Sequence, residues 1–354
     1  MADGPLAVNG PERPAREAVD NGHRLFRSGM VRVRKEAMKR ILASLLLALT
    51  LALPAPAGAQ ATEIVQDYEP DPAIWLLEDD DTKIYLLGTV HALPAGFRWR
   101  SARLDEIVEQ ADELIVESSE EDMRRDDAAM GEVIGELAKR PRVSERLSPE
   151  NGWKWLALGE SLGLPAEYFD RLPPLLALFG IGTSFGREET GSEADHGVES
   201  VLEADFRTAG KPIASIEDGN AVLRSLLAIN EAVLIKELDR ELSRWNGASP
   251  AAMFVGAPAK RVAGQDDSLL AQEHAWAQGE EVDVRDQMFG PAGFGPAMGK
   301  ILLDNRNRAW AAWLENRLAE PGTLLVAVGA AHLAGHNSVH AMLTKRGLTS
   351  KRLN

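Results

Sequence analysis

Apolar runs of strand length alternate with longer stretches of helical periodicity along this chain. Residues 73–91 (AIWLLEDDDTKIYLLGTVH) hold two apolar runs on either side of the acidic residues 79–81, which predicts a β-hairpin. Further short apolar runs at 113–117, 212–217 and 323–332 predict three more strands. The last of these, TLLVAVGAAH, is apolar almost throughout, which is typical of a strand buried on both faces.

Amphipathic stretches separate these strands and predict helices. The expected helices cover 147–164, 193–210, 219–246, 305–322 and 335–347. Because strands alternate with helices, we expect an α/β (or α+β) fold with one central mixed sheet flanked by helices. Residues 60–354 are expected to form a single domain, with a helical insertion over roughly 120–190 and 245–300.

The N-terminal segment has a different character. Residues 38–59 combine a basic start at Lys39 and Arg40, an apolar run from Ile41 to Leu53 and small residues before Gln60, which is the pattern of a cleaved signal peptide. The polar residues 1–37 are expected to be a disordered extension or a start codon assigned too early. The sequence therefore predicts a periplasmic or secreted protein with no stable membrane span after cleavage.

Composition narrows the classes of function. The chain of 354 residues carries a formal net charge of −15, which argues against nucleic acid as a partner because nucleic acid is itself a polyanion. It contains no Cys, so thiolate metal sites and Cys nucleophiles are excluded. Nucleotide-binding glycine motifs are absent as well.

A strand followed by Gly-x-x-His occurs twice, as YLLGTVH ending at His91 and as VAVGAAH ending at His332. In each case a glycine (Gly88 and Gly329) lets the backbone turn tightly and leaves room for a ligand. A single His at a strand end is more often a structural residue. Two matched motifs predict instead that both imidazoles meet at one metal site.

Acidic residues end two of the other predicted strands. Glu117 would complete a metal site with the two imidazoles, and its alternative role is a solvated strand end or helix cap. Glu217 is a candidate general base or a partner of the metal ligands, or equally a cap of the next helix. Arg306 could bind a substrate carboxylate or an oxyanion, whereas its local sequence favours a salt bridge on its own helix.

Other polar residues are weaker candidates. His196 and Glu199 could point into the same cleft, and His336 is expected on the surface or at a helix cap. His274 and His340 are expected to be exposed.

Several spaced motifs together resemble the TraB/GumN family, which includes the TIKI-like metalloproteases. They are YLLGTVHALP, ELIVES, GVESVLEADFRTAGKPIASIED, NRNRAWAAWLENRL and TLLVAVGAAHLAGHNSV, and the resemblance covers about residues 70–352. It implies a fold similar to the erythromycin esterase and ChaN-like group. Two positions depart mildly from the pattern: Glu199 stands where Asp is expected, and Ala331 where Gly is common.

The resemblance implies a metal-dependent hydrolase with a manganese- or cobalt-type ion at His91, Glu117 and His332, while Glu217 and Arg306 match positions that are commonly Glu and Arg. On ligand chemistry alone, Zn and Fe fit as well. We therefore expect an exported metallopeptidase that acts on a peptide or small-molecule substrate, of unknown oligomeric state. Two alternatives stay open: a non-catalytic binder of haem, iron or a peptide signal, and an interaction protein in which the histidines only fasten strand ends.

Overall fold

The computed structural model describes residues 64–119, 122, 135–137, 139–161, 166–177, 191–228, 230–245, 270–281, 296 and 299–354. The predicted signal peptide at 38–59, the extension before it and much of the predicted insertion lie outside these residues. None of the helices in the described ranges combines the length and apolar character that crossing a bilayer requires.

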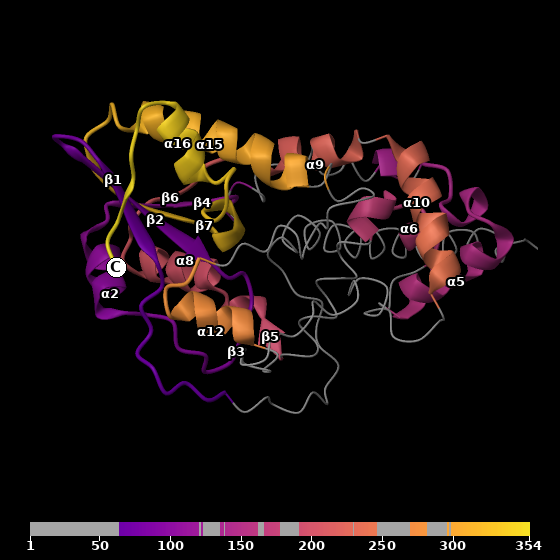
Figure 1. Ribbon diagram of the computed structural model, residues 1–354, viewed down its shortest axis with the longest axis horizontal. Helices are drawn as coiled ribbons and strands as arrows, with labels where there is room; N and C mark the ends of the chain where they lie inside the picture. The colour runs from indigo at the N-terminus through magenta and orange to yellow at the C-terminus, as the bar shows by residue number, and fades with distance from the viewer. Residues whose placement is uncertain are drawn as a thin grey trace, which may run out of the picture.

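A six-stranded mixed sheet forms the centre of the molecule, in the order β6-β4-β7-β2-β1-β8 (Figure 1). The four strands β2, β7, β4 and β6 run parallel to one another, whereas β1 pairs antiparallel with β2 and with β8. The strands are β1 (Ile74–Glu78), β2 (Thr82–Thr89), β4 (Glu113–Val116), β6 (Ile213–Ser215), β7 (Gly322–Gly329) and β8 (Lys351–Arg352). The predicted α/β fold with a central mixed sheet is confirmed, and so is the hairpin over 73–91.

Helices cover both faces of the sheet. Helices α2 (Ala102–Gln110), α8 (Val198–Thr208) and α12 (Ala271–Ala277) lie on one face, and α15 (Asn305–Arg317) and α16 (Val339–Lys345) lie on the other (Figure 1). Each strand supplies apolar side chains to both layers of helices, because successive side chains of a strand point to opposite sides of the sheet.

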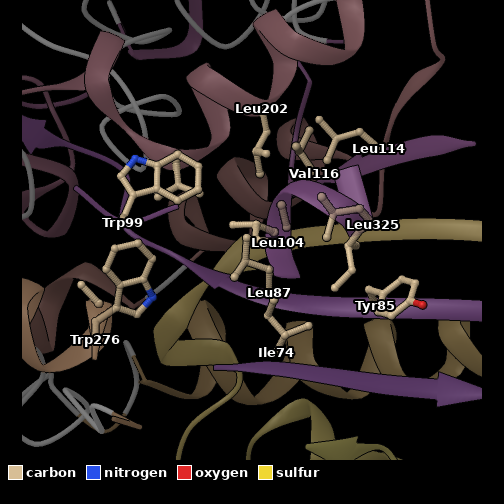
Figure 2. Close-up of a cluster of buried hydrophobic side chains, with 14 of the residues drawn as sticks. Ile74, Tyr85, Leu87, Trp99, Leu104, Leu114, Val116, Leu202, Trp276 and Leu325 are labelled. Atoms are coloured by element: carbon tan, nitrogen blue, oxygen red, sulfur yellow. The ribbon is translucent and has the colours of Figure 1, made fainter. Parts of the chain in front are cut away.

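The residues of β2 show this alternation directly. Tyr85 and Leu87 join the cluster beneath α2, α8 and α12, where Trp276 also packs (Figure 2). Ile84 and Leu86 join the cluster beneath α15 and α16. β2 is therefore buried on both faces, and so is β7, as its apolar sequence predicted.

A separate helical cluster lies away from the sheet. It contains α5 (Pro149–Ser161), α6 (Ala166–Phe169), α9 (Gly219–Leu227) and α10 (Glu231–Arg244), whose apolar side chains share one core with Val143 and Leu147 on either side of η1 (Ser144–Arg146). The rings of Trp155 and Phe169 stack in that core with centroids 4.5 Å apart. Figure 1 shows α5, α6 and α10 together at the end of the molecule farthest from the sheet. The helical insertion extends beyond the predicted 120–190 and 245–300, because α9 and α10 pack with its helices.

The long helix predicted over 219–246 is wrong as a single element. One helix, α9, ends at Leu227, and a second, α10, begins at Glu231. The side chain of Asn230 accepts a hydrogen bond from the backbone N–H of Ala232 and so caps the start of α10.

Short elements complete the described structure. They are β3 (Leu93–Pro94), β5 (Ser192–Glu193), η2 (Ala194–His196), the π-helix η3 (Lys300–Asp304) and η4 (Ala330–His332). β3 and β5 pair as a small second sheet.

Two histidines expected on the surface are enclosed instead. His274 is buried, and its Nδ1 lies 2.7 Å from the hydroxyl of Tyr68. His340 packs over Trp75 with ring centroids 4.5 Å apart. Aromatic neighbours that are distant in the sequence enclose both rings, and no local pattern shows such neighbours. His336 is exposed, as predicted.

Candidate active site

The ends of the four parallel strands bring the predicted site residues together. The carboxyl ends of parallel strands share one edge of a sheet, where ligands gather in α/β folds. His91 and His332 follow β2 and β7, which pair through Thr89 and Gly329 at their last residues. Glu117 directly follows β4, and Glu217 lies two residues beyond β6. Topology alone therefore collects side chains from four distant parts of the chain.

Arg306 lies at the centre of this group and is only 5% exposed. Its Nε donates to Glu217 at 2.9 Å, and its Nη2 donates to Glu217 at 2.6 Å and also to Glu117. Its Nη1 donates to the carbonyl of Leu302 at 3.0 Å and lies 3.2 Å from Nε2 of His332. A guanidinium has five N–H donors, and these contacts use all of them. The salt bridge predicted within its own helix is wrong, because both carboxylates come from strand ends.

Glu117 is surrounded by positive charge and by a backbone donor. Its Oε1 accepts the N–H of Gly329 at 2.8 Å and lies 3.7 Å from Nε2 of His332. Burial alone would raise the pKa of this carboxyl, but the charge of Arg306, the two neighbouring imidazoles and the Gly329 N–H outweigh it and hold the pKa well below its usual range. Glu117 is therefore ionised at neutral pH.

The imidazole of His332 is held in one tautomer. Its Nδ1 lies 2.6 Å from Oδ1 of Asn307, whose amide nitrogen donates to the carbonyl of Asn337 at 2.7 Å. This second bond fixes which way the amide points, so Oδ1 accepts and Nδ1 of His332 carries the proton. The lone pair of Nε2 then faces Arg306 and Glu117. The indole of Trp310 packs against the ring, with centroids 4.2 Å apart.

His91 is held from the opposite side. Its Nδ1 lies 2.6 Å from Oε1 of Glu199, and the hydroxyl of Thr89 donates to the same oxygen. Burial alone would lower the pKa of His91, but the charge of Glu199 and the contact with it raise the pKa to about 9. The side chain of His91 is 30% exposed, against 5% for His332, so solvent reaches the site from the His91 side.

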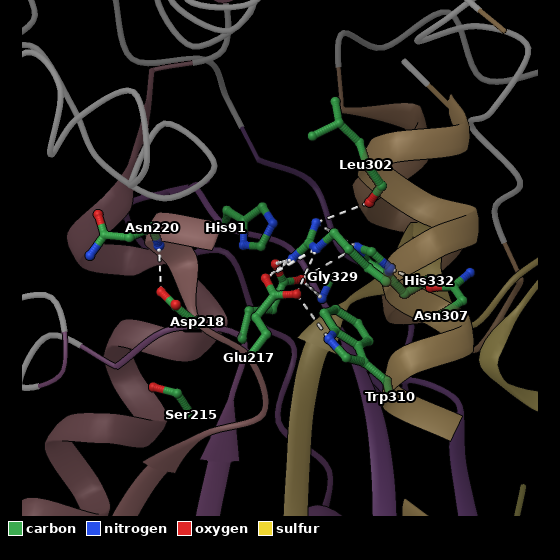
Figure 3. A network of polar contacts seen from close by, with 12 residues as sticks. His91, Ser215, Glu217, Asp218, Asn220, Leu302, Asn307, Trp310, Gly329 and His332 are labelled. Atoms are coloured by element: carbon green, nitrogen blue, oxygen red, sulfur yellow. Dashed lines mark hydrogen bonds and ion pairs between the residues drawn. The ribbon is translucent and has the colours of Figure 1, made fainter. Parts of the chain in front are cut away.

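Figure 3 shows His91 and Glu217 on one side of the polar network and His332, Asn307 and Trp310 on the other, with the hydrogen bonds converging between them. The structure thus brings together all five chemically active residues predicted from the sequence, namely His91, Glu117, Glu217, Arg306 and His332. Their roles as ligands or catalysts stay predictions.

The two motif glycines have different surroundings. A Cβ on Gly329 would stand 3.1 Å from Oε1 of Glu117 and 3.2 Å from Nε2 of His91, so its absence keeps open the space between these groups. A Cβ on Gly88 would stand 3.0 Å from Cα of Ala330. Gly88 therefore makes room for the turn η4 that carries His332, and only Gly329 borders the site itself.

Glu217 differs from Glu117 although both bind the same guanidinium. It also accepts a hydrogen bond from the indole N–H of Trp310 at 2.9 Å. Burial raises its pKa above the usual value despite the opposing charge of Arg306, and the negative charge of Glu117 adds to the increase. The carboxylate of Glu217 is therefore more basic than that of Glu117.

Sequence reasoning missed several partners. Asn307 and Trp310 follow Arg306 on the first turns of α15, and Thr89 ends β2. Glu199 was noted as a candidate, but its pairing with His91 depends on how α8 packs. Asn307 is adjacent to Arg306 and Trp310 is one turn beyond it, so a helical wheel through Arg306 could have indicated Trp310.

The residues present fit a divalent ion in their chemistry and in how they are held. Both imidazoles have Nδ1 within 2.6 Å of an acceptor oxygen, which is the side on which metal-ligating histidines are usually held. Arg306 binds two carboxylates, those of Glu117 and Glu217, and a third carboxylate, that of Glu199, lies against His91, so the cluster can accommodate further positive charge. As the side chains lie, no three or more His, Cys, Asp or Glu residues of the described ranges form a ready-made metal site. Arg306 contacts two of the three predicted ligands, which accounts for this.

Comparisons with known proteins agree with the resemblance. The sequence model of the TraB/PrgY/gumN family matches residues 73–352. An uncharacterized protein of Escherichia coli (strain K12), YbaP, is 24% identical over 272 residues, which cover 77% of this chain and 92% of that protein. YbaP of Shigella flexneri, also uncharacterized, matches to the same extent. No solved structure matches the chain.

Proposed function

Because the chain belongs to the TraB/PrgY/gumN family, we propose that it is an exported, metal-dependent hydrolase, and specifically a metallopeptidase. His91, Glu117 and His332 would hold the ion, of the manganese or cobalt type. One observation carries the proposal: two imidazoles, each with Nδ1 in contact with an acceptor oxygen, lie beside the same ionised carboxylate at the carboxyl edge of the sheet.

A divalent ion bound there would activate water and polarise a carbonyl group. Glu217 is the better proton acceptor of the two acids, since burial raises its pKa while the pKa of Glu117 is depressed. A general base works best when its pKa lies close to the working pH. Glu217 would therefore take the proton from the attacking water.

Arg306 positions both acids, because its five N–H groups are all used within the chain. Once Glu217 gains a proton, its negative charge is lost and its hold on the guanidinium weakens. An N–H of Arg306 then becomes available to a developing oxyanion, which is the catalytic role predicted for this residue. The ion and the guanidinium of Arg306 would both bind Glu117 and His332. The lone pairs of these two side chains would therefore be shared between the ion and Arg306.

The substrate would be a peptide or another small molecule with a hydrolysable carbonyl, and it would approach from the more exposed His91 side. The predicted signal peptide supports a reaction in the periplasm or outside the cell.

Metal content and hydrolysis of the purified 60–354 chain test the proposal. We expect about one divalent ion per chain, and His91→Ala and His332→Ala should lose both the ion and peptide hydrolysis. His336→Ala is the matched control, because His336 is exposed and close to His332 in sequence. The proposal fails if either site variant keeps its ion and full activity.

Glu217→Gln separates chemistry from metal binding. It removes the proton acceptor and leaves the three predicted ligands in place, so hydrolysis should fall by about 10²–10⁴-fold with metal content unchanged. In the unaltered protein the rate should rise as the pH increases through the elevated pKa of Glu217. Equal kcat values for Glu217→Gln and the unaltered protein would exclude this role.

The second candidate function is structural: the two histidines would only hold strand ends together in an interaction protein. The complete use of the Arg306 donors within the chain favours it. In that case His332→Ala would lower the melting temperature, while the unaltered protein would carry no ion and hydrolyse nothing.

A further inference from the structure

We propose that Glu199, fixed in turn by Thr89, is the positioning residue that holds the ring of His91 with its Nε2 facing Glu117. This inference deepens the proposed function and rests on it where metal binding is concerned. The orientation of the ring itself can be tested without any metal.

The first turn of α8 is packed directly against the loop that carries His91. The backbone N–H of Val198 donates to the carbonyl of Val90 at 3.0 Å. A Cβ on Gly197 would stand 2.1 Å from the carbonyl oxygen of His91, so only glycine permits this approach. The start of the helix and the histidine loop are therefore in fixed contact, which brings Glu199 within reach of the imidazole.

Glu199 is buried, with 7% of its surface exposed, and its Oε1 contacts two groups. Nδ1 of His91 lies 2.6 Å from this oxygen, and the hydroxyl of Thr89 donates to it as well. Thr89 is the last residue of β2, so its position is set by the sheet. Orientation thus passes from the strand to the carboxylate and from the carboxylate to the ring.

An ionised carboxylate can only accept hydrogen bonds, so it holds a proton of the imidazole on Nδ1. Nε2 faces the site, 3.2 Å from where a Cβ on Gly329 would stand, and the second proton of the imidazolium sits there until a bound ion displaces it. Carboxylates bound to histidine ligands in this way fix the tautomer, orient the ring and raise its basicity. Mutation of such partners usually weakens metal binding by about 10–100-fold.

The two imidazoles are held by different chemistry. His332 is 5% exposed and its Nδ1 contacts a neutral amide, whereas His91 is 30% exposed and its Nδ1 contacts a carboxylate. Water competes for the more exposed ring, and hydrogen bonds to charged groups are the stronger ones. The charged partner, Glu199, therefore restrains the ring of His91, which packing alone holds less firmly than the ring of His332.

Co²⁺ titration followed by visible absorption tests the role of Glu199. Glu199→Ala removes the acceptor and should weaken Co²⁺ binding by about 10–100-fold. Glu199→Gln keeps an acceptor oxygen and loses only the charge, so its affinity should lie between those of the alanine variant and the unaltered protein. Glu203→Gln is the matched control, because Glu203 lies one turn further along α8, is equally buried at 8% and contacts Arg207.

Thr89 provides an independent pair of variants. Thr89→Val removes the hydroxyl at nearly constant volume, while Thr89→Ser keeps it. We expect weaker Co²⁺ binding in the first and near-normal binding in the second. Equal affinities of the two variants would contradict the part assigned to Thr89.

¹⁵N NMR of the histidine side chains in metal-free protein distinguishes failure of this inference from failure of the proposed function. If the unaltered protein binds no Co²⁺, the metal-dependent function is wrong, and the NMR result decides the positioning role. The ring nitrogen shifts of His91 should change in Glu199→Ala and stay unchanged in Glu203→Gln. Unchanged His91 shifts in Glu199→Ala, or unchanged Co²⁺ affinity in a protein that binds the ion, would overturn the inference.

Discussion

Arg306 contacts three other residues of the candidate site. It joins Glu117 and Glu217, which follow two neighbouring strands, and it contacts the lone pair of His332. The sequence predicted that these residues belong to one site, because each lies at a strand end or at a helix start. It could not predict the saturated guanidinium, since this depends on three side chains from different strands converging on one helix turn.

Arg306→Gln should destabilise the fold strongly. Removing one partner of a buried ion pair leaves the other charge uncompensated, which typically costs about 3–5 kcal/mol. Here two carboxylates, of Glu117 and Glu217, lose their common partner. Urea unfolding should therefore show a marked loss in the free energy of unfolding.

Arg308→Gln is the control for that measurement, because Arg308 is exposed on the same helix and donates to the nearby side chain of Asn305 at 3.2 Å. Its effect should stay within about 0.5 kcal/mol. Equal losses in the two variants would show that the buried network contributes no more than a surface contact.

At the scale of elements, the strongest patterns were predicted most accurately. The hairpin at 73–91 and the strand β7 follow long apolar runs, which local preferences alone are enough to predict. The region 219–246 was misjudged because its apolar periodicity continues across a break. The break is marked only by Asn230, whose side chain starts α10.

Asn230→Ala should weaken α10 without altering the sheet. Loss of an N-cap side chain typically costs about 1 kcal/mol. Among the described residues, the core of the helical cluster that contains α10 is separate from the two cores of the sheet, so the loss should appear as faster hydrogen exchange in α10 and its neighbours α5 and α9. Unchanged exchange in these helices would mean that Asn230 does not determine where the helix begins.

At the scale of the whole molecule, the alternation of strands and helices was enough to predict the α/β class and the edge where the site lies. What it could not predict is which distant side chains enclose one another. His340 illustrates this, since its ring lies against Trp75 of the first strand and its Nδ1 lies 2.7 Å from the hydroxyl of Ser350. Neither neighbour is evident from the helix on which His340 lies.

The enclosure of His340 predicts a pH dependence of stability. Burial lowers its pKa from 6.5 to about 4. Between these values the unfolded chain binds one more proton than the folded chain, so the free energy of unfolding decreases as the pH falls, by up to about 1.4 kcal/mol per pH unit. His340→Gln should remove this part of the slope between pH 6.5 and 4 in urea unfolding, and identical slopes would contradict the prediction.

The central claim is that His91, Glu117 and His332 share one divalent ion. A crystal structure of the 60–354 chain grown with Mn²⁺ or Co²⁺, with anomalous scattering recorded at the metal edge, tests this most directly. We expect one strong anomalous peak about 2.1 Å from Nε2 of both histidines and from a carboxylate oxygen of Glu117. A map with no peak among these side chains, and with Arg306 still bound to Glu117, would contradict the claim.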